Sequence, residues 1–207
     1  MVAAAVLLCA ASGAEDPGLA LAPGGGEREW KPLIDALAAK GTVVAPFTER
    51  RYFPFRHDPT VLGGTIRMSR ERGLSLQYTA PQASVMVADS QGIILRDGEG
   101  HQRELQSGSH GTGGLAALLP IMRFDFAALY PAFVITARGS SDAWTFDFLP
   151  RDPEVARSLG EILIGGTGTD VHRLEFRRSA SQRVEIDVGE TRSGTPFTPA
   201  ELRQFFR

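Results

Sequence analysis

The sequence has almost no cysteine, very few lysines and no apolar run long enough to cross a membrane. Cys9 is the only cysteine in 207 residues, so no disulfide can form within the chain. Lys31 and Lys40 are the only lysines, and arginines dispersed along the chain supply the remaining positive charge. A bilayer-spanning helix needs about 20 consecutive apolar residues, and the chain contains no such stretch. We therefore expect a soluble mature protein.

Neither sign of charge dominates, which excludes bulk electrostatic attraction as a means of binding. The formal net charge is -2 and the pI is near 6.1. Nucleic acids and anionic membrane surfaces attract proteins with a clear positive excess, so we expect no nucleic-acid partner. With 43% hydrophobic and 22% charged residues, the chain fits one globular domain with a sizeable core, and we expect a monomer.

The chain opens with a segment typical of export signals. Val2 to Ala11 is apolar, and Ser12-Gly13-Ala14 places small residues at the two positions that a signal peptidase inspects. We predict a signal peptide over residues 1–14 and a flexible Gly/Pro-rich linker over residues 15–26. A single globular domain would then occupy residues 27–207.

Cys9 lies inside this signal, so the mature chain would have no thiol nucleophile. A lipoprotein signal ending at Cys9 is the alternative, and it would make the protein membrane-anchored. Leu8 argues against it, because lipoprotein signals usually place a small residue directly before the cysteine.

Helical spacing appears first, and alternating spacing follows it. Glu27 to Lys40 carries apolar residues at intervals of three and four, which predicts an amphipathic helix. Later helices are predicted from Thr112 to Met122, over residues 125–130, and after Thr198, which is followed by Pro199 and then by Glu201 as in a capped N-terminus.

Most of the chain between these helices alternates apolar and polar residues, as strands with one apolar face do. The alternating sets are Ile66 and Met68, Leu74, Leu76 and Tyr78, Val85 and Val87, Phe133 and Ile135, Trp144, Phe146 and Phe148, Ile162 and Ile164, Leu174 and Phe176, and Val184, Ile186 and Val188. Curling of the sheet, or a cover of helices, must keep these apolar faces from water. The pattern predicts an α+β domain built on a long, barrel-like antiparallel sheet.

Five short segments carry a resemblance to a known family. They are Phe47 to Arg51, Gly64 to Arg70, Leu74 to Pro81, Val85 to Asp89 and Phe146 to Pro150. Their order and spacing resemble the outer-membrane lipoprotein carrier family, the LolA-like proteins, over about Glu27 to Val188. Ser90 stands where the family usually has glycine, and the end of the chain does not match the better-known carriers, so the resemblance is to a divergent branch.

The resemblance implies an incomplete antiparallel β-barrel, that is, a curved sheet with helices lidding its concave apolar side. Such a periplasmic carrier accepts acylated lipoprotein or lipid cargo from an inner-membrane transporter and passes it to an outer-membrane acceptor. It needs no cofactor and performs no covalent chemistry. We expect the cargo to contact the following residues: Phe47, Ile66, Met68, Arg70, Leu74, Leu76, Tyr78, Val85, Val87, Leu118, Met122, Phe133, Ile135, Trp144, Phe146 and Phe148.

The family's functional arginine falls on Arg70, which shares strand parity with Ile66 and Met68. An arginine facing an apolar cavity needs a hydrogen-bond partner. One interpretation is that the lid supplies this partner and releases it when ligand enters. The other is that Arg70 lies at the end of a strand and extends into water.

Motifs that would indicate a specific catalytic or metal-binding activity are weak in this sequence. The glycine-rich segment Gly108 to Gly114 lacks the lysine of a phosphate-binding loop, so a flexible loop is favoured. The four histidines show no metal-ligand spacing, the aspartates mostly adjoin turn residues, and no serine lies in a G-x-S-x-G motif. We therefore predict that the protein has no metal site and is not an enzyme.

Two alternatives stay open. The aromatic stripes could fill a solid core and leave no cavity. The same scaffold could also serve as an envelope lipid-sensing or interaction module, although a sensor normally carries an output domain, for which we see no room in this sequence.

Overall fold

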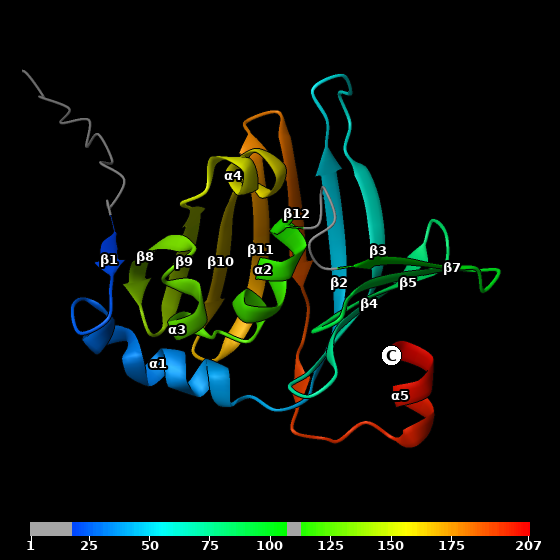
Figure 1. Ribbon diagram of the computed structural model, residues 1–207, viewed down its shortest axis with the longest axis horizontal. Helices are drawn as coiled ribbons and strands as arrows, with labels where there is room; N and C mark the ends of the chain where they lie inside the picture. The colour runs from blue at the N-terminus through cyan, green and yellow to red at the C-terminus, as the bar shows by residue number, and fades with distance from the viewer. Residues whose placement is uncertain (1–17, 107–112) are drawn as a thin grey trace, which may run out of the picture.

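The computed structural model describes residues 18–106 and 113–207, which form one curved antiparallel sheet with helices on both faces (Figure 1). The sheet has 13 strands in the order β1-β8-β9-β10-β11-β12-β2-β3-β4-β5-β6-β7, and the short β13 pairs with β2. No pairing joins β1 to β7 among these residues, so the barrel is not closed. The predicted fold class, α+β with an incomplete antiparallel barrel and helices over its concave side, is confirmed.

The element bounds follow the sequence pattern closely. The strands are β1 (Leu19–Leu21), β2 (Val43–Tyr52), β3 (Thr60–Ser69), β4 (Gly73–Ala80), β5 (Ser84–Asp89), β6 (Gly92–Asp97), β7 (Gln102–Gln106), β8 (Phe133–Ser140), β9 (Ala143–Pro150), β10 (Glu161–Thr167), β11 (Asp170–Ser179), β12 (Gln182–Val188) and β13 (Arg192–Ser193). The helices are α1 (Glu27–Ala39), α2 (Gly113–Met122), α3 (Phe126–Leu129), α4 (Pro153–Leu159) and α5 (Pro199–Phe205).

The start of the chain differs from the predicted linker. β1 lies within residues 15–26, where Leu21 is buried and pairs with Ile135 of β8, so that β1 forms this edge of the sheet. Leu-Ala-Leu is short but apolar enough to add to an open edge, which leaves only residues 22–26 to turn the chain into α1. The predicted signal peptide, residues 1–14, lies outside the described residues.

One half of the concave face is a solid aromatic core. Trp30 of α1 and Phe126 of α3 contact Phe146 of β9 with ring centroids 5.6 and 5.2 Å apart, both edge-on. Phe146 and Phe148 have no exposed surface. Each edge-to-face pair adds about 0.5–1.5 kcal/mol beyond the burial of its area, so α1 and α3 are fixed firmly on β8 to β10.

A second, smaller core lies on the opposite face of β3 to β6, under α5. Arg96 donates from Nη2 to the carbonyl of Phe206 at 2.9 Å, and the Arg67 guanidinium lies 3.6 Å from the centroid of the Phe205 ring. The predicted cap is confirmed: the Thr198 hydroxyl accepts from the backbone N–H of Glu201, whose carboxylate accepts from that of Thr198. The end of the chain is thus a fixed part of the fold.

A candidate ligand cavity in the concave face

The other half of the concave face is hollow. A cavity of about 380 Å³ lies between the sheet and the helices α2 and α4, within the range of roughly 300–1,000 Å³ that is usual for small-molecule sites. Its lining comprises Glu49, Arg51, Tyr52, Phe53, Ile66, Leu74, Leu76, Tyr78, Met86, Leu118, Met122, Ser158, Leu159, Leu174, Phe176, Arg178, Gln182, Arg183, Val184 and Ile186. Most of these side chains are apolar.

Strand register explains one wall of the cavity. Residues directly opposite on neighbouring strands point to the same face. Leu174 of β11 lies opposite Ile186 of β12, and Phe176 lies opposite Val184. These four side chains therefore form an apolar strip along two strands.

The other wall and the cover come from different elements. Ile66, Leu76 and Met86 lie opposite one another on β3, β4 and β5. Leu118 and Met122 reach the cavity from α2, while Ser158 and Leu159 reach it from α4. A smaller cavity of about 80 Å³ continues toward α1.

Eight of the residues predicted to contact cargo line one or other of the two cavities. Ile66, Leu74, Leu76, Tyr78, Leu118 and Met122 line the larger one. Met68 and Arg70 line the smaller one. The strand parity of β3 and β4 and the position of α2 therefore bring the predicted residues together, while their contact with cargo stays a prediction.

Phe47 and the aromatic residues of β8 and β9 are not part of the lining. Phe47 packs against the ring of Tyr78 with centroids 5.4 Å apart. Phe133, Ile135, Trp144, Phe146 and Phe148 belong to the solid aromatic core, where each is at most 3% exposed. Core packing, the simpler alternative, therefore describes these residues.

Val85 and Val87 lie on the face of the sheet opposite the cavity, which corrects the prediction for these two residues. They pair with Gln77 and Ser75, whereas the cavity residues Leu74 and Leu76 pair with Ala88 and Met86. Both parities of β5 are apolar because α5 covers the convex face there, so alternation alone could not choose the inward side.

Arg70 does not make the predicted lid contact through its side chain. It follows the last residue of β3 and is exposed. Its backbone carbonyl, not its guanidinium, meets the end of α2 by accepting a hydrogen bond from Nη2 of Arg123 at 2.6 Å. Among the described residues no hydrogen bond from the Arg70 guanidinium is present, which favours the interpretation that it extends into water.

A polar cluster at one end of the cavity was not predicted. Glu49 is 2% exposed, its Oε1 accepts from Nε of Arg51, and its Oε2 accepts from the Tyr78 hydroxyl at 2.8 Å. Nη2 of Arg51 also approaches the Tyr78 hydroxyl at 3.5 Å. Glu49 and Arg51 share strand parity with the buried Ala45 and Phe47, so the alternation of β2 held a signal for this cluster.

The cluster is electrostatically coupled. Burial alone lowers the pKa of Arg51, but the hydrogen bond and charge of Glu49 outweigh it, so the pKa is raised. Burial, together with Glu49, raises the pKa of the Tyr78 hydroxyl, which stays protonated as a donor. A buried carboxylate is tolerated only with such partners.

The rim of the cavity is aromatic and cationic. The Arg183 guanidinium lies 3.8 Å from the centroid of the Tyr52 ring. Phe53 also lines the cavity and stacks on Phe55, which is 81% exposed in the loop after β2. The rim therefore presents both ring surface and guanidinium groups.

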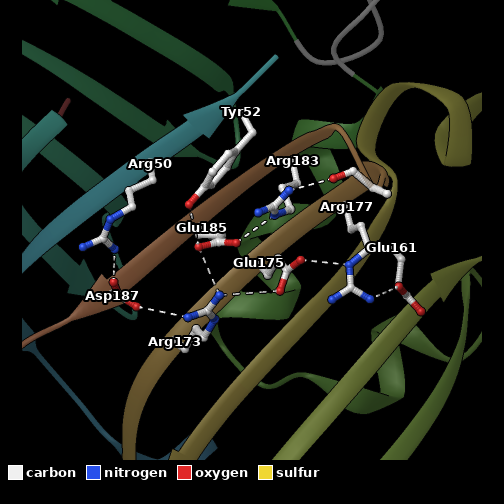
Figure 2. Close-up of polar contacts among 10 residues, drawn as sticks. Arg50, Tyr52, Glu161, Arg173, Glu175, Arg177, Arg183, Glu185 and Asp187 are labelled. Carbon is white, nitrogen blue, oxygen red and sulfur yellow. Dashed lines mark hydrogen bonds and ion pairs between the residues drawn. The ribbon is translucent and has the colours of Figure 1, made fainter. Parts of the chain in front are cut away.

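The convex face behind this rim carries a network of ion pairs. Figure 2 shows Arg173 between Glu175, Glu185 and Asp187, with Arg183 also bound to Glu185. Each of these strands thus places apolar side chains inward and charged ones outward. The network fixes the polar face of the strands but offers no cavity.

One group of potential metal ligands occurs among the described residues. Asp97 ends β6, and Glu99 and His101 follow it; all three are exposed, with ligand atoms within 4.8 Å of one another. The Asp97 carboxylate already accepts from the backbone N–H groups of Glu99 and His101 and contacts Nδ1 of His101. These bonds account for the cluster as turn chemistry.

Comparison with known proteins assigns the chain to a family. A family model described as outer membrane lipoprotein carrier protein LolA-like matches residues 27–191. The chain belongs to this LolA-like family. No curated protein sequence matches it.

Several solved structures are similar to the chain at low sequence identity. An outer membrane lipoprotein-sorting protein domain from Vibrio parahaemolyticus matches with a TM-score of 0.51 at 7% identity, over 84% of this chain and 94% of that one. A LolA superfamily protein from Nitrosomonas europaea has a TM-score of 0.44 at 8% identity, over 83% and 96%. The Pseudomonas aeruginosa MucA/MucB complex has a TM-score of 0.45 at 13% identity, over 84% and 59%.

The described helices of this LolA-like chain are short. None of them is both long and apolar enough to cross a membrane.

Proposed function

We propose that the protein is a periplasmic carrier that binds the acyl chains of lipoproteins or lipids in the larger cavity and moves them from the inner to the outer membrane. An inner-membrane transporter would supply the cargo, and an outer-membrane acceptor would receive it. The role is one of binding, without catalysis, as the family description of a lipoprotein carrier suggests.

The observation that supports this proposal most is the hollow half of the sheet. Its lining is largely apolar, it is covered by the short helices α2 and α4, and its volume suits part of an acyl chain. Apolar surface left unfilled in a folded protein costs packing energy, and an acyl chain would recover it.

The test starts with protein purified from the envelope fraction of its own host. Native and denaturing mass spectrometry would identify any acylated molecule that accompanies it, and a fluorescent fatty-acid probe would measure binding by the emptied protein. We expect acylated ligands to co-purify.

A cavity-filling variant shows where such ligands bind. Met86 is half-buried and lines the cavity, so Met86→Trp should occupy part of the space and weaken probe binding about tenfold or more. Leu149→Trp, on the exposed convex side at 49% exposure, is the matched control and should bind as the parent does.

An empty protein that takes up no probe would contradict the carrier role. An envelope sensing or interaction module on the same scaffold would then explain the chain better.

A further inference from the structure

The charged residues of the larger cavity are unequally divided. Arg51, Arg178 and Arg183 contribute to its lining, whereas Glu49 is the only acidic residue that the described part of the chain contributes. Arg183 is paired with Glu185 behind the rim, so two arginines and one carboxylate leave a net positive charge at a mostly apolar cavity. Glu49 is also buried and fully engaged by Arg51 and Tyr78, so it offers nothing to a ligand.

The register gathers the arginines at one end of the cavity. Arg51 of β2 lies opposite Val184 of β12, which lies opposite Phe176 of β11. Arg178 follows two residues after Phe176, beside the irregularity in the β11–β12 pairing. Strand spacing puts the Cα atoms of Arg51 and Arg178 about 12 Å apart, so two extended guanidinium groups can reach one anion between them.

Arg51 and Arg178 retain unused donors. A guanidinium has five N–H groups, and Arg51 uses Nε on Glu49 and Nη2 on Tyr78. Arg178 is exposed, and within the described part of the chain no hydrogen bond of its side chain is present. Arg183, by contrast, is bound to Glu185 and to the carbonyl of Ala180 (Figure 2).

We infer that the cargo is an anionic amphiphile, whose acyl chain fills the apolar strip while its carboxylate or phosphate lies between Arg51 and Arg178. This inference rests on the carrier function proposed above and narrows its substrate class. Charge-assisted bonds from arginine to carboxylate or phosphate are the strong ones in proteins. A neutral acyl group would cover the same apolar surface but leave these donors without an anionic partner.

The test compares acyl compounds that share one chain and differ in the head. Emptied protein is titrated with palmitate, with palmitoyl lysophosphatidic acid and with neutral monopalmitoylglycerol, each displacing a neutral pyrene-labelled alcohol. At least one anionic compound should bind about tenfold or more tightly than the neutral one, because it gains charge-assisted bonds. The ranking of palmitate against the lysophosphatidic acid distinguishes a carboxylate head from a phosphate head.

Two variants locate the effect. Arg178→Gln removes an exposed charge, and the double variant Glu49→Gln with Arg51→Gln removes a charge pair without leaving a buried carboxylate alone. Each should reduce the anionic preference, taken as the ratio of anionic to neutral binding within the same variant, to about threefold or less. Arg103→Gln, exposed on β7, removes the same formal charge as Arg178→Gln and should keep the full preference.

The outcomes separate the two proposals. Neutral and anionic compounds that bind equally, or variants that keep the preference, would overturn the anionic cargo and leave the carrier intact. A protein that binds none of the three compounds would overturn both.

Discussion

Glu49 is a single strand position on which a buried network of polar contacts depends. It is the one carboxylate of the described strand β2, and it follows the buried inward residues Ala45 and Phe47. Its two oxygens are bound by different side chains from two strands, Arg51 of β2 and Tyr78 of β4. A buried charge held in this way costs little, whereas the loss of one partner exposes the full cost of its desolvation.

Tyr78→Phe should therefore destabilise the protein by about 1–3 kcal/mol, because Oε2 of Glu49 loses its donor. Urea unfolding of the two proteins measures the difference. Tyr52→Phe is the control, since its hydroxyl contacts Glu185 at 3.4 Å on the wetter side of the sheet, and it should cost under about 1 kcal/mol. Equal costs for the two variants would show that Glu49 does not depend on Tyr78.

Asp147 offers a second test at the residue scale, on the convex face. Burial, followed by the neighbouring Glu161 carboxylate, raises the pKa of Asp147 from 3.8 to about 6, although Arg138 and Arg177 act in the opposite direction. The folded state thus binds this proton more tightly than the unfolded state. Its contribution to stability is complete below about pH 4 and is lost as the pH rises through about 6.

Asp147→Asn removes this titration. Relative to the parent, the variant should gain unfolding free energy as the pH rises from about 4 to about 7, by on the order of 1–2 kcal/mol because water screens the partly exposed carboxyl. Unfolding curves across that range check the prediction, with Asp142→Asn in the exposed turn before β9 as control. The prediction would be contradicted if the unfolding free energies of the parent and the Asn variant changed in parallel with pH.

At the scale of the element, α5 is held by side chains that the rest of the fold provides. Phe206 directly after α5 is 1% exposed and Phe205 is 7% exposed. They lie on the face of the sheet that also buries Val87 and Ile94. The helix therefore completes a core of its own, separate from the cavity.

Phe206→Ala should cost about 3–5 kcal/mol, as large-to-small changes in a core do. Phe55→Ala, at 81% exposure, is the matched control and should change stability by less than about 0.5 kcal/mol. Thermal unfolding compares them. If Phe206→Ala left the stability unchanged, α5 would lie on the sheet without contributing to its core.

Elements also show what sequence could and could not predict. β3 and β4 alternate cleanly, and their inward residues Ile66, Leu74 and Leu76 reach the cavity as predicted. β5 is apolar on both parities, so its inward face depends on α5, which lies far away in sequence. Leu-Ala-Leu of β1 is too short to stand out from a Gly/Pro-rich segment, and only the open edge of β8 makes it a strand.

At the scale of the whole molecule, the sheet divides into a solid half and a hollow half. Trp30, Phe126 and Phe146 fill one, while α2 and α4 cover the other without filling it. The sequence shows how many aromatic residues are present, but it does not show the distance between the layers that they fill. Cavity and core are therefore indistinguishable by alternation, and only the three-dimensional arrangement separates Leu76 from Phe148.

The attachment of the last residue has a practical consequence. Arg207 pairs with Asp89 through Nε at 2.8 Å and also contacts Glu104, so this residue is bound against β5 and β7. A purification tag or fluorescent fusion joined directly after Arg207 would begin inside this contact and strain it. Labels are better inserted in the exposed turn at Gly98 to Gly100, because an insertion there extends directly into solvent.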